Sequence, residues 1–432
     1  MNQMLMYIDP GTGGMLFTIL FGLLGGLFYF LGTFLVKIKY SVGGGRKGAR
    51  NEKRVPLVVF SDHKRYGNTF GPILDELEKR GIETRFLTMS EDDPLLSKEY
   101  KHISCEFIGK GNAAFSKLNL LNAEVVLSTT PGLDVLMWKR SRKVDYYVHI
   151  PHATSDITLY RMFGIDFYDA LLLPGEYHID QIRKLEELRD LSAKETVVVG
   201  TPYMDVMRER LLEAEKASGT ETETEENRET ENPGKQDGKK TVLVAPSWGD
   251  SSILRKFGEE FIDALIKTGY DIVIRPHPQS YTAEKEFLEG LMAKYGEGSG
   301  VTWNKDNDNF DILRKADIMI SDFSGVVFDF TLVFDKPVIY ADTSFDASVY
   351  DQAWLDDELW TFKTLPKLGV RLSPDQFDHV KDVIDSCIND ETYKAGREQA
   401  RKETWFYIGE SVKRTADYLE NKIAEIEKEK TA

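Results

Sequence analysis

Two kinds of hydrophobic pattern alternate along the chain from Val55 onward. Longer stretches with an apolar residue at every third or fourth position predict helices, the first of them over Pro72–Arg80. Short runs of branched or aromatic residues predict strands between these helices, at Leu57–Phe60, Thr84–Thr88, Glu106–Ile108, Val125–Ser128, Tyr146–Ile150, Ala170–Leu173 and Thr196–Val199. Strands that alternate with helices favour βαβ units and a parallel sheet.

A second set of expected strands follows later in the chain, at Thr241–Ala245, Asp271–Ile274, Val301–Trp303, Ile318–Ile320 and Val338–Tyr340. The C-terminal stretch Glu391–Lys430 has a helical pattern with an apolar stripe formed by Tyr407, Val412, Ala416 and Leu419. Two such sets predict an α/β protein with two Rossmann-like domains that face a cleft. In folds of this kind, ligands bind outside the carboxyl ends of the strands.

The pattern is interrupted between the two sets. Residues 213–240 are rich in Glu and Thr and contain no aromatic or branched aliphatic side chain, which predicts a disordered acidic linker or a protruding loop. The expected organisation is therefore a first segment over 1–50, a Rossmann-like domain over 51–212, the linker over 213–240, a second Rossmann-like domain over 241–388 and C-terminal helices over 389–432.

The first segment predicts one N-terminal transmembrane helix. Met15–Val36 carries no charged side chain, and a helix of this length spans about 33 Å, enough for a hydrocarbon core of about 30 Å. Seven basic residues follow it against the single acidic Glu52: Lys37, Lys39, Arg46, Lys47, Arg50, Lys53 and Arg54. The positive-inside rule then predicts a single-pass protein of the cell membrane, with the N-terminus outside and the other domains in the cytoplasm.

Composition excludes several classes of function. Lys and Arg number 55 against 71 Asp and Glu, so the formal net charge is −16, which argues against a partner nucleic acid. The two cysteines, Cys105 and Cys387, are far apart, which excludes a disulfide framework and a cysteine-based zinc site. No motif predicts a metal ion or a cofactor.

The segment after the expected strand Ile318–Ile320 is the first candidate for chemistry. Gly325–Phe334 has a helical pattern, and the residues before it that could cap the helix start are Ser321, Asp322 and Ser324. A helix N-terminus offers free N–H groups and a partial positive charge, so this one could bind a diphosphate, with Gly325 allowing a close approach. Asp329 could reach a ribose or an amine. Plain helix capping is the competing interpretation.

Two histidine-containing segments follow other expected strands. Arg275 and His277 come directly after one of them, a pairing that suits charge stabilisation or proton donation at a phosphoryl oxygen. His152 follows another and could act as a general base toward a hydroxyl. His149 falls within the expected strand itself, so we interpret it as structural.

Five blocks in order resemble the CDP-glycerol glycerophosphotransferase family of teichoic-acid synthesis, over roughly Val55 to Asp342. The blocks are His152-Ala153-Thr154, Gly200-Thr201-Pro202-Tyr203-Met204-Asp205, Ala245-Pro246-Ser247-Trp248, Arg275-Pro276-His277-Pro278, and Ser321-Asp322-Phe323-Ser324-Gly325 with Asp329. The resemblance implies a GT-B-like fold and an enzyme that moves glycerol phosphate from CDP-glycerol, or a similar CDP-alditol, to a lipid-linked or glycan acceptor at a bacterial-type cytoplasmic membrane.

The resemblance also implies roles for individual residues. The first domain would take the acceptor side and the second the nucleotide donor, with His152 as the base. The positions that match the family's donor-binding residues are Ser247, Trp248, Arg275, His277, Ser324, Gly325 and Asp329. This chain departs from the family where Tyr203 and Gly249 replace two arginines.

Two alternatives stay open at this point. One is a GT-B glycosyltransferase that uses a nucleotide sugar, since the same helix N-terminus would hold its diphosphate. The other is a non-enzymatic, membrane-anchored nucleotide-binding protein that keeps the fold.

Overall fold

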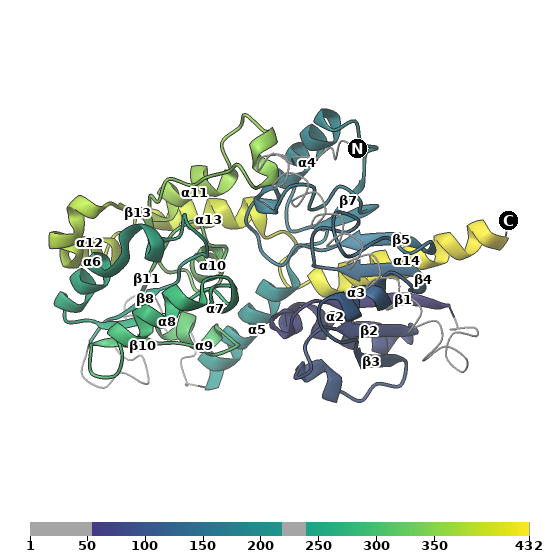
Figure 1. Ribbon diagram of the computed structural model, residues 1–432, viewed down its shortest axis with the longest axis horizontal. Coiled ribbons are helices and arrows are strands. Elements are labelled where there is room, and N and C mark those ends of the chain that lie inside the picture. Colours follow the sequence, from purple (N-terminus) through teal and green to yellow (C-terminus); the bar gives the residue numbers. More distant parts are fainter. Residues whose placement is uncertain (1–53, 218–238, 432) are drawn as a thin grey trace, which may run out of the picture. The chain divides into compact units, whose positions relative to one another are not determined.

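Two parallel β-sheets organise residues 54–217 and 239–431, the parts of the chain that this computed structural model describes (Figure 1). The first sheet has the strand order β3-β2-β1-β4-β5-β6-β7 and the second β10-β9-β8-β11-β12-β13. Neighbouring strands pair in parallel throughout both sheets. The α/β class predicted from the alternating pattern is therefore confirmed.

We call the first sheet and its helices the N-lobe. Its strands are β1 (Val55–Ser61), β2 (Thr84–Thr88), β3 (Ile103–Phe107), β4 (Asn122–Ser128), β5 (Lys143–His149), β6 (Ala170–Leu173) and β7 (Glu195–Val198). Its helices are α2 (Gly67–Arg80), α3 (Asn112–Leu118), α4 (Tyr177–Leu188) and α5 (Pro202–Ala217), with short turns η2 (Lys64–Tyr66), η3 (Pro94–Ser97) and η4 (Ile157–Leu159).

The second sheet and its helices form the C-lobe. Its strands are β8 (Thr241–Val244), β9 (Asp271–Ile274), β10 (Val301–Trp303), β11 (Ile318–Ser321), β12 (Val338–Ala341) and β13 (Gly369–Leu372). The helices and turns of this half are α6 (Ile253–Lys267), α7 (Ser280–Ala283), α8 (Lys285–Lys294), α9 (Phe310–Lys315), α10 (Val326–Phe328), η5 (Asp329–Val333), η6 (Asp351–Trp354), α11 (Trp360–Leu368), η7 (Pro374–His379), α12 (Val380–Ile388) and α13 (Tyr393–Thr404). The last helix, α14 (Ser411–Thr431), packs on the N-lobe.

Apolar helix faces cover both sides of each sheet, as parallel sheets require. On the N-lobe, α2 and the C-terminal helix α14 lie side by side (Figure 1), and Phe70 and Leu419 from these helices belong to one core. On the C-lobe, α5 contributes Met204 and Met207 to the core beneath β8 and β11, although α5 follows the last strand of the N-lobe in sequence. Helices α5 and α14 therefore join the two lobes into one compact unit that begins at Val55.

Most expected strands occur where the sequence placed them, and Thr84–Thr88, Ala170–Leu173, Asp271–Ile274 and Val301–Trp303 match to the residue. The strand expected at Glu106–Ile108 begins earlier, at Ile103. The edge strand β13 was not predicted. Only Val370 and Leu372 are branched aliphatic residues in it, and its Gly369 lies so close to β12 that a Cβ there would stand 1.5 Å from the Val338 carbonyl oxygen.

Two helix predictions were wrong in detail. The helix expected over Gly325–Phe334 is a three-residue α-turn, α10, followed by the π-helical turn η5, a form that occurs often at functional sites. The C-terminal stretch divides into α13 and α14 around residues 405–410. Tyr407 lies in this break with 42% of its surface exposed, whereas the predicted stripe residues Ala416 and Leu419 are buried.

Two sequence predictions concern residues outside those described. The membrane span expected at Met15–Val36 and most of the acidic linker belong to this part of the chain. Within residues 54–217 and 239–431, no helix combines the length and apolar character needed to cross a bilayer.

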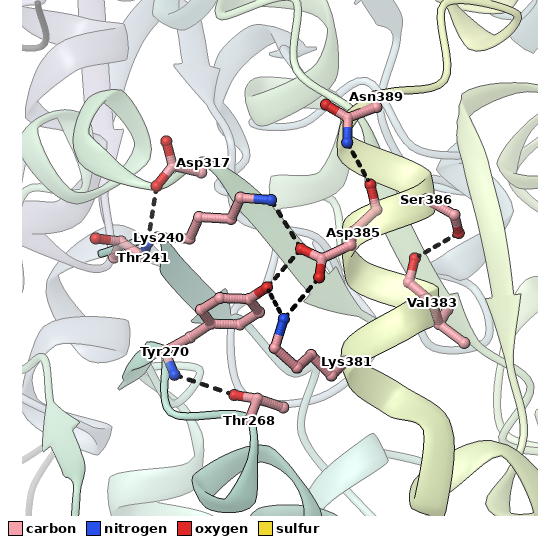
Figure 2. Close-up of polar contacts among 10 residues, drawn as sticks. All are labelled: Lys240, Thr241, Thr268, Tyr270, Asp317, Lys381, Val383, Asp385, Ser386 and Asn389. Atoms are coloured by element: carbon pink, nitrogen blue, oxygen red, sulfur yellow. Dashed lines mark hydrogen bonds and ion pairs between the residues drawn. The ribbon is translucent and has the colours of Figure 1, made fainter. Parts of the chain in front are cut away.

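The C-lobe sheet begins in a polar network directly after the acidic segment (Figure 2). Lys240 and Lys381 both pair with Asp385 of α12, at 2.7 and 2.8 Å, and the Tyr270 hydroxyl donates to the same carboxylate. The two ammonium groups hold the pKa of Asp385 far below its usual range. This network fixes α12 against the amino ends of β8 and β9, the edge of the sheet opposite the carboxyl ends.

Candidate active site

The strand order of each sheet indicates where a ligand would bind. It reverses between β1 and β4 in the N-lobe and between β8 and β11 in the C-lobe, and doubly wound sheets bind ligands outside the carboxyl ends at such points. A cavity of about 720 Å³ lies there, lined by residues of both lobes. It contains six predicted site residues: His152, Arg275, His277, Ser324, Gly325 and Asp329.

A second cavity of about 440 Å³ adjoins the first. It contains the predicted residues Ser247 and Trp248 and shares His152, His277 and Gly325 with the larger cavity. We call the shared region the junction. Ser247 is nearly buried, and its side chain, by hydrogen bonding, helps to limit the rise in the pKa of Asp322.

His152 follows β5 and stands between two tyrosine rings. Its ring centroid lies 5.0 Å from that of Tyr66 and 6.0 Å from that of Tyr160, with the Tyr160 ring stacked on it. Burial is the main cause that lowers the pKa of His152 to about 3, and the positive charge of Arg65 and the proximity of His277 contribute to this value. The imidazole is therefore neutral at pH 7, the state in which it can accept a proton.

His277 enters the junction from the C-lobe, three residues beyond the end of β9. Its Nδ1 accepts a hydrogen bond from the Gln279 backbone N–H at 3.1 Å, so the neutral ring carries its proton on Nε2. Burial, aided by the charge of Arg65, lowers the pKa of His277 to about 4. The ring can thus donate a hydrogen bond through Nε2 without carrying a charge. Trp248 lies beside it, with ring centroids 6.5 Å apart.

The loop after β11 separates its predicted residues into two groups. Ser324 and Gly325 line both cavities, and Gly325 comes so close to the N-lobe that a Cβ there would lie 3.2 Å from the Cβ of Ala153. Ser321 and Asp322 line neither. They are fully buried, and the Ser321 hydroxyl donates to the Ala245 carbonyl oxygen at 2.6 Å. The sequence therefore placed these two residues in the correct loop but not at the cavity.

Asp322 holds the loop together. Its carboxylate accepts hydrogen bonds from the backbone N–H groups of Ser247, Ile253 and Ser324, at 2.9 to 3.1 Å. Burial raises the pKa of Asp322 to about 6, and these three N–H groups oppose that rise. The α-turn that follows has no side-chain cap, so the expected helix-capping role becomes one of fixing the loop shape.

The far end of the larger cavity is polar. Burial raises the pKa of Asp329 to about 7, while a hydrogen bond with the Tyr203 hydroxyl limits the rise. Tyr203 donates to the Oδ1 of Asn309 at 2.8 Å, and Arg275 donates to Asn304. These groups can bind hydroxyls and an anionic group. Tyr203, which takes the place of an arginine of the resembled family, supplies a hydroxyl here rather than a charge.

His149 is buried beneath the site rather than in it. Its Nε2 lies 3.2 Å from the Tyr160 hydroxyl, and it lines neither cavity, which agrees with its interpretation as structural.

Among the cavity residues that the sequence did not single out are Arg65, Tyr66 and Tyr160. Arg65 and Tyr66 lie in the turn η2 after β1, so the rule that ligands bind at carboxyl ends could have found them. Tyr160 lies far along the loop after β5, and the sequence around it does not indicate that it reaches a cavity.

Among residues 54–217 and 239–431, no group of three His, Cys, Asp or Glu side chains is placed to hold a metal ion.

Comparison with known families gives a match over most of the chain. The family described as CDP-Glycerol:Poly(glycerophosphate) glycerophosphotransferase matches residues 50–408. A curated relative, the teichoic acid glycerol-phosphate primase of Bacillus subtilis strain 168, is 31% identical over 120 residues, which cover 26% of this chain. The match spans only 28% of the length of that relative.

Solved structures share the fold over a much longer range. The wall teichoic acid polymerase TagF superimposes with a TM-score of 0.55 at 16% identity and covers 91% of this chain and 96% of its own. A putative UDP-N-acetylglucosamine 2-epimerase from Listeria monocytogenes gives a TM-score of 0.51 at 12% identity, over 86% of this chain and 98% of its own. At these identities the likeness establishes the fold.

Proposed function

Because the chain belongs to the CDP-glycerol:poly(glycerophosphate) glycerophosphotransferase family, we propose that it transfers glycerol phosphate from CDP-glycerol, or a related CDP-alditol, to an acceptor hydroxyl. One observation carries this proposal. Two neutral imidazoles, His152 from the N-lobe and His277 from the C-lobe, meet in one junction beside Arg275 and the loop of Ser324.

The reaction is a displacement at phosphorus. The acceptor oxygen attacks the phosphorus that bears glycerol, a new P–O bond forms, and the bond from that phosphorus to the bridging oxygen of CMP breaks. The hydroxyl proton passes to His152, and CMP leaves with the electron pair of the broken bond. Phosphoryl transfer needs little covalent help from the protein, so positioning and charge stabilisation supply most of the rate.

The C-lobe residues would stabilise the charge that develops. The Nε2–H of His277 and the guanidinium of Arg275 would donate to phosphoryl oxygens, and Ser324 and Gly325 allow the diphosphate to approach the backbone. Asp329 would accept hydrogen bonds from the ribose hydroxyls.

The donor itself would adjust the basicity of His152. In the free protein its pKa is held near 3, too low for an efficient base at pH 7. A bound diphosphate brings negative charge next to the imidazole, which raises its pKa because the protonated form is then favoured. Proton transfer would thus become favourable only with the donor in place.

We also propose that the chain is anchored in the cell membrane through Met15–Val36, with its N-terminus outside and both lobes in the cytoplasm. The charge-free stretch and the basic residues after it support this orientation. An anchored transferase would work at the surface where a lipid-linked acceptor lies.

A panel of donors tests the reaction. Full-length protein in detergent is expected to release CMP from CDP-glycerol or CDP-ribitol, and to release no nucleotide from UDP- or GDP-sugars. H152A and H277A are each expected to lose at least about 100-fold in turnover, the usual scale for removing a proton-transfer group or a preorganised hydrogen-bond donor. H379A, which removes an exposed histidine, serves as the control.

Other outcomes would contradict the proposal in distinct ways. Release of nucleotide only from sugar donors would identify a glycosyltransferase. Losses below about threefold in both histidine variants would contradict the assigned roles, because general catalysis contributes far more than that. If both variants also kept cellular function, the protein would be a binding protein that does not catalyse.

A further inference from the structure

Arg65 reaches the junction from the turn directly after β1. The turn is held in place by His63, whose Nδ1 accepts the Arg65 backbone N–H at 3.1 Å and whose carbonyl accepts the Tyr66 N–H at 3.2 Å. The guanidinium carbon lies 4.8 Å from the centre of the Tyr66 ring, so the side chain stacks on an aromatic face. Arg65 lines both cavities, opposite His277, Ser324 and Gly325 of the C-lobe.

The positive charge of Arg65 lowers the pKa of both imidazoles. For His152 and for His277 it is the largest cause of the lowered pKa after burial. Arg65 lines both cavities, as His152 and His277 do, so its side chain shares the junction with the two rings. Neighbouring Lys64 is different, since its ammonium pairs with Asp92.

The Arg65 guanidinium also has unmet hydrogen-bonding capacity. Its Nε is buried and has no hydrogen-bond partner within the described part of the chain. A buried donor left unpaired is costly, so native structures nearly always satisfy it. Because Arg65 lines both cavities, its guanidinium is placed to bind an anion there, and its fork matches two phosphate oxygens at once.

We propose that Arg65 binds the glycerol-bearing phosphoryl group of the donor from the N-lobe, across the cleft from Arg275 and His277. This inference rests on the proposed function. The β-phosphoryl group is the one that must reach the junction, because the acceptor attacks it there beside His152. The α-phosphoryl group and the nucleoside would stay on the C-lobe, next to Arg275 and Asp329.

The inference accounts for a departure from the family. Two arginines of the resembled motifs are Tyr203 and Gly249 in this chain, so the site offers less positive charge to a diphosphate than the motifs predict. Arg65 supplies a guanidinium from the opposite lobe. A donor held by cations from both lobes would favour the closed arrangement needed for transfer.

Three variants of the full-length protein test the proposal. R65M removes the charge, R65K keeps it without the fork, and K79M removes one charge from an exposed part of α2 as the control. The probes are CMP, which lacks the β-phosphoryl group, CDP, which has it, and CDP-glycerol. Binding is measured by calorimetry, and turnover by CMP release.

We expect a selective effect. R65M should lower kcat/KM for CDP-glycerol by about 100- to 1,000-fold, the scale for losing one preorganised donor, and R65K by at least about tenfold. The affinity of R65M for CDP should fall as well, while its affinity for CMP should stay within about twofold of that of the unmodified protein. The acid limb of the kcat/KM profile should move to higher pH in R65M, because both histidines lose a neighbouring positive charge. K79M should behave like the unmodified protein.

Each alternative result has one meaning. Equal losses of CMP and CDP affinity would overturn the proposal, since Arg65 would then act on the nucleoside side or on the fold. Unchanged turnover in R65M and R65K would overturn it as well. If R65M does not fold, R65K decides, and kcat/KM within threefold of the unmodified protein would overturn it. If the unmodified protein turns over no CDP-alditol, the proposed function fails, and the CDP and CMP affinities still decide whether Arg65 contacts a β-phosphoryl group.

Discussion

At the scale of single residues, burial rather than charge pairing sets the ionisation of the site. Desolvation is the largest cause of the lowered pKa values of His152 and His277 and of the raised value of Asp329. The free site therefore holds neutral imidazoles and a carboxyl group that is half ionised near pH 7. This state suits a ligand that brings its own negative charge, because binding adds few unpaired charges to the cavity.

The pH dependence of ligand affinity tests the role of the Asp329 carboxyl group. Its pKa of about 7 means that the ionised fraction rises from about one tenth at pH 6 to about nine tenths at pH 8. The carboxylate accepts hydrogen bonds better than the acid, so cytidine affinity should rise up to about ninefold over that range. D329N should show no rise and should match the unmodified protein near pH 6. Calorimetry with cytidine avoids the titration of a ligand phosphate, and a rise that persists in D329N would refute the role.

At the scale of elements, two residues of one resembled motif, Gly200 and Asp205, support the fold rather than line the site. Gly200 ends the N-lobe sheet with a φ of +91°, and a Cβ there would lie 2.4 Å from the Phe406 carbonyl oxygen. Five residues later, the Asp205 carboxylate accepts from the Trp405 indole at 2.9 Å and from Ser411. The glycine and the aspartate of this block therefore fix the segment that leads from α13 to α14.

G200A should consequently destabilise the protein. The left-handed backbone and the close carbonyl both penalise a side chain, so we expect a loss of at least about 2 kcal/mol in the free energy of unfolding. G290A in α8 is the matched control, since a Cβ there meets nothing within 4 Å and alanine favours a helix by about 1 kcal/mol. Thermal unfolding measures both. Equal melting temperatures for G200A and G290A would contradict the argument.

At the scale of the molecule, a segment of the C-lobe locks onto the N-lobe beside the site. Asp351 is fully buried, pairs with Arg189 at 2.6 Å and accepts the Phe163 N–H at 2.7 Å. The Asp351 N–H in turn donates to the Tyr160 carbonyl oxygen at 2.9 Å. Tyr160 stacks on His152, so these contacts couple the lobe-to-lobe arrangement to the position of the proposed base.

D351A should loosen this connection. It leaves the buried Arg189 with Asp166 as its remaining carboxylate partner, and breaking buried ion pairs typically costs about 3–5 kcal/mol. We expect a lower melting temperature and faster hydrogen exchange at the amide of Phe163. D342A removes a half-exposed carboxylate that pairs with Arg371 and should change neither measurement. Unaltered exchange in D351A would contradict the coupling.

Prediction from sequence succeeded where the signal is local. Runs such as Ala170–Leu173 matched to the residue because a strand buried on both faces is continuously apolar. It failed at β13, which has little apolar sequence and whose pairing depends on the close approach of Gly369 to β12. It also failed for η5, because a π-turn and an α-helix share almost the same pattern of apolar residues.

The sequence by itself determined the α/β class, the family and several loops that line the cavities, since periodicity and short motifs depend on residues close together in the chain. Only the tertiary structure decided which residues share a cavity. It brought Arg65 and His152 to His277, and it buried Asp322 beneath a loop whose Ser324 lines the site. The reason is physical: strand order and packing set distances between residues far apart in sequence, and burial then sets their charge.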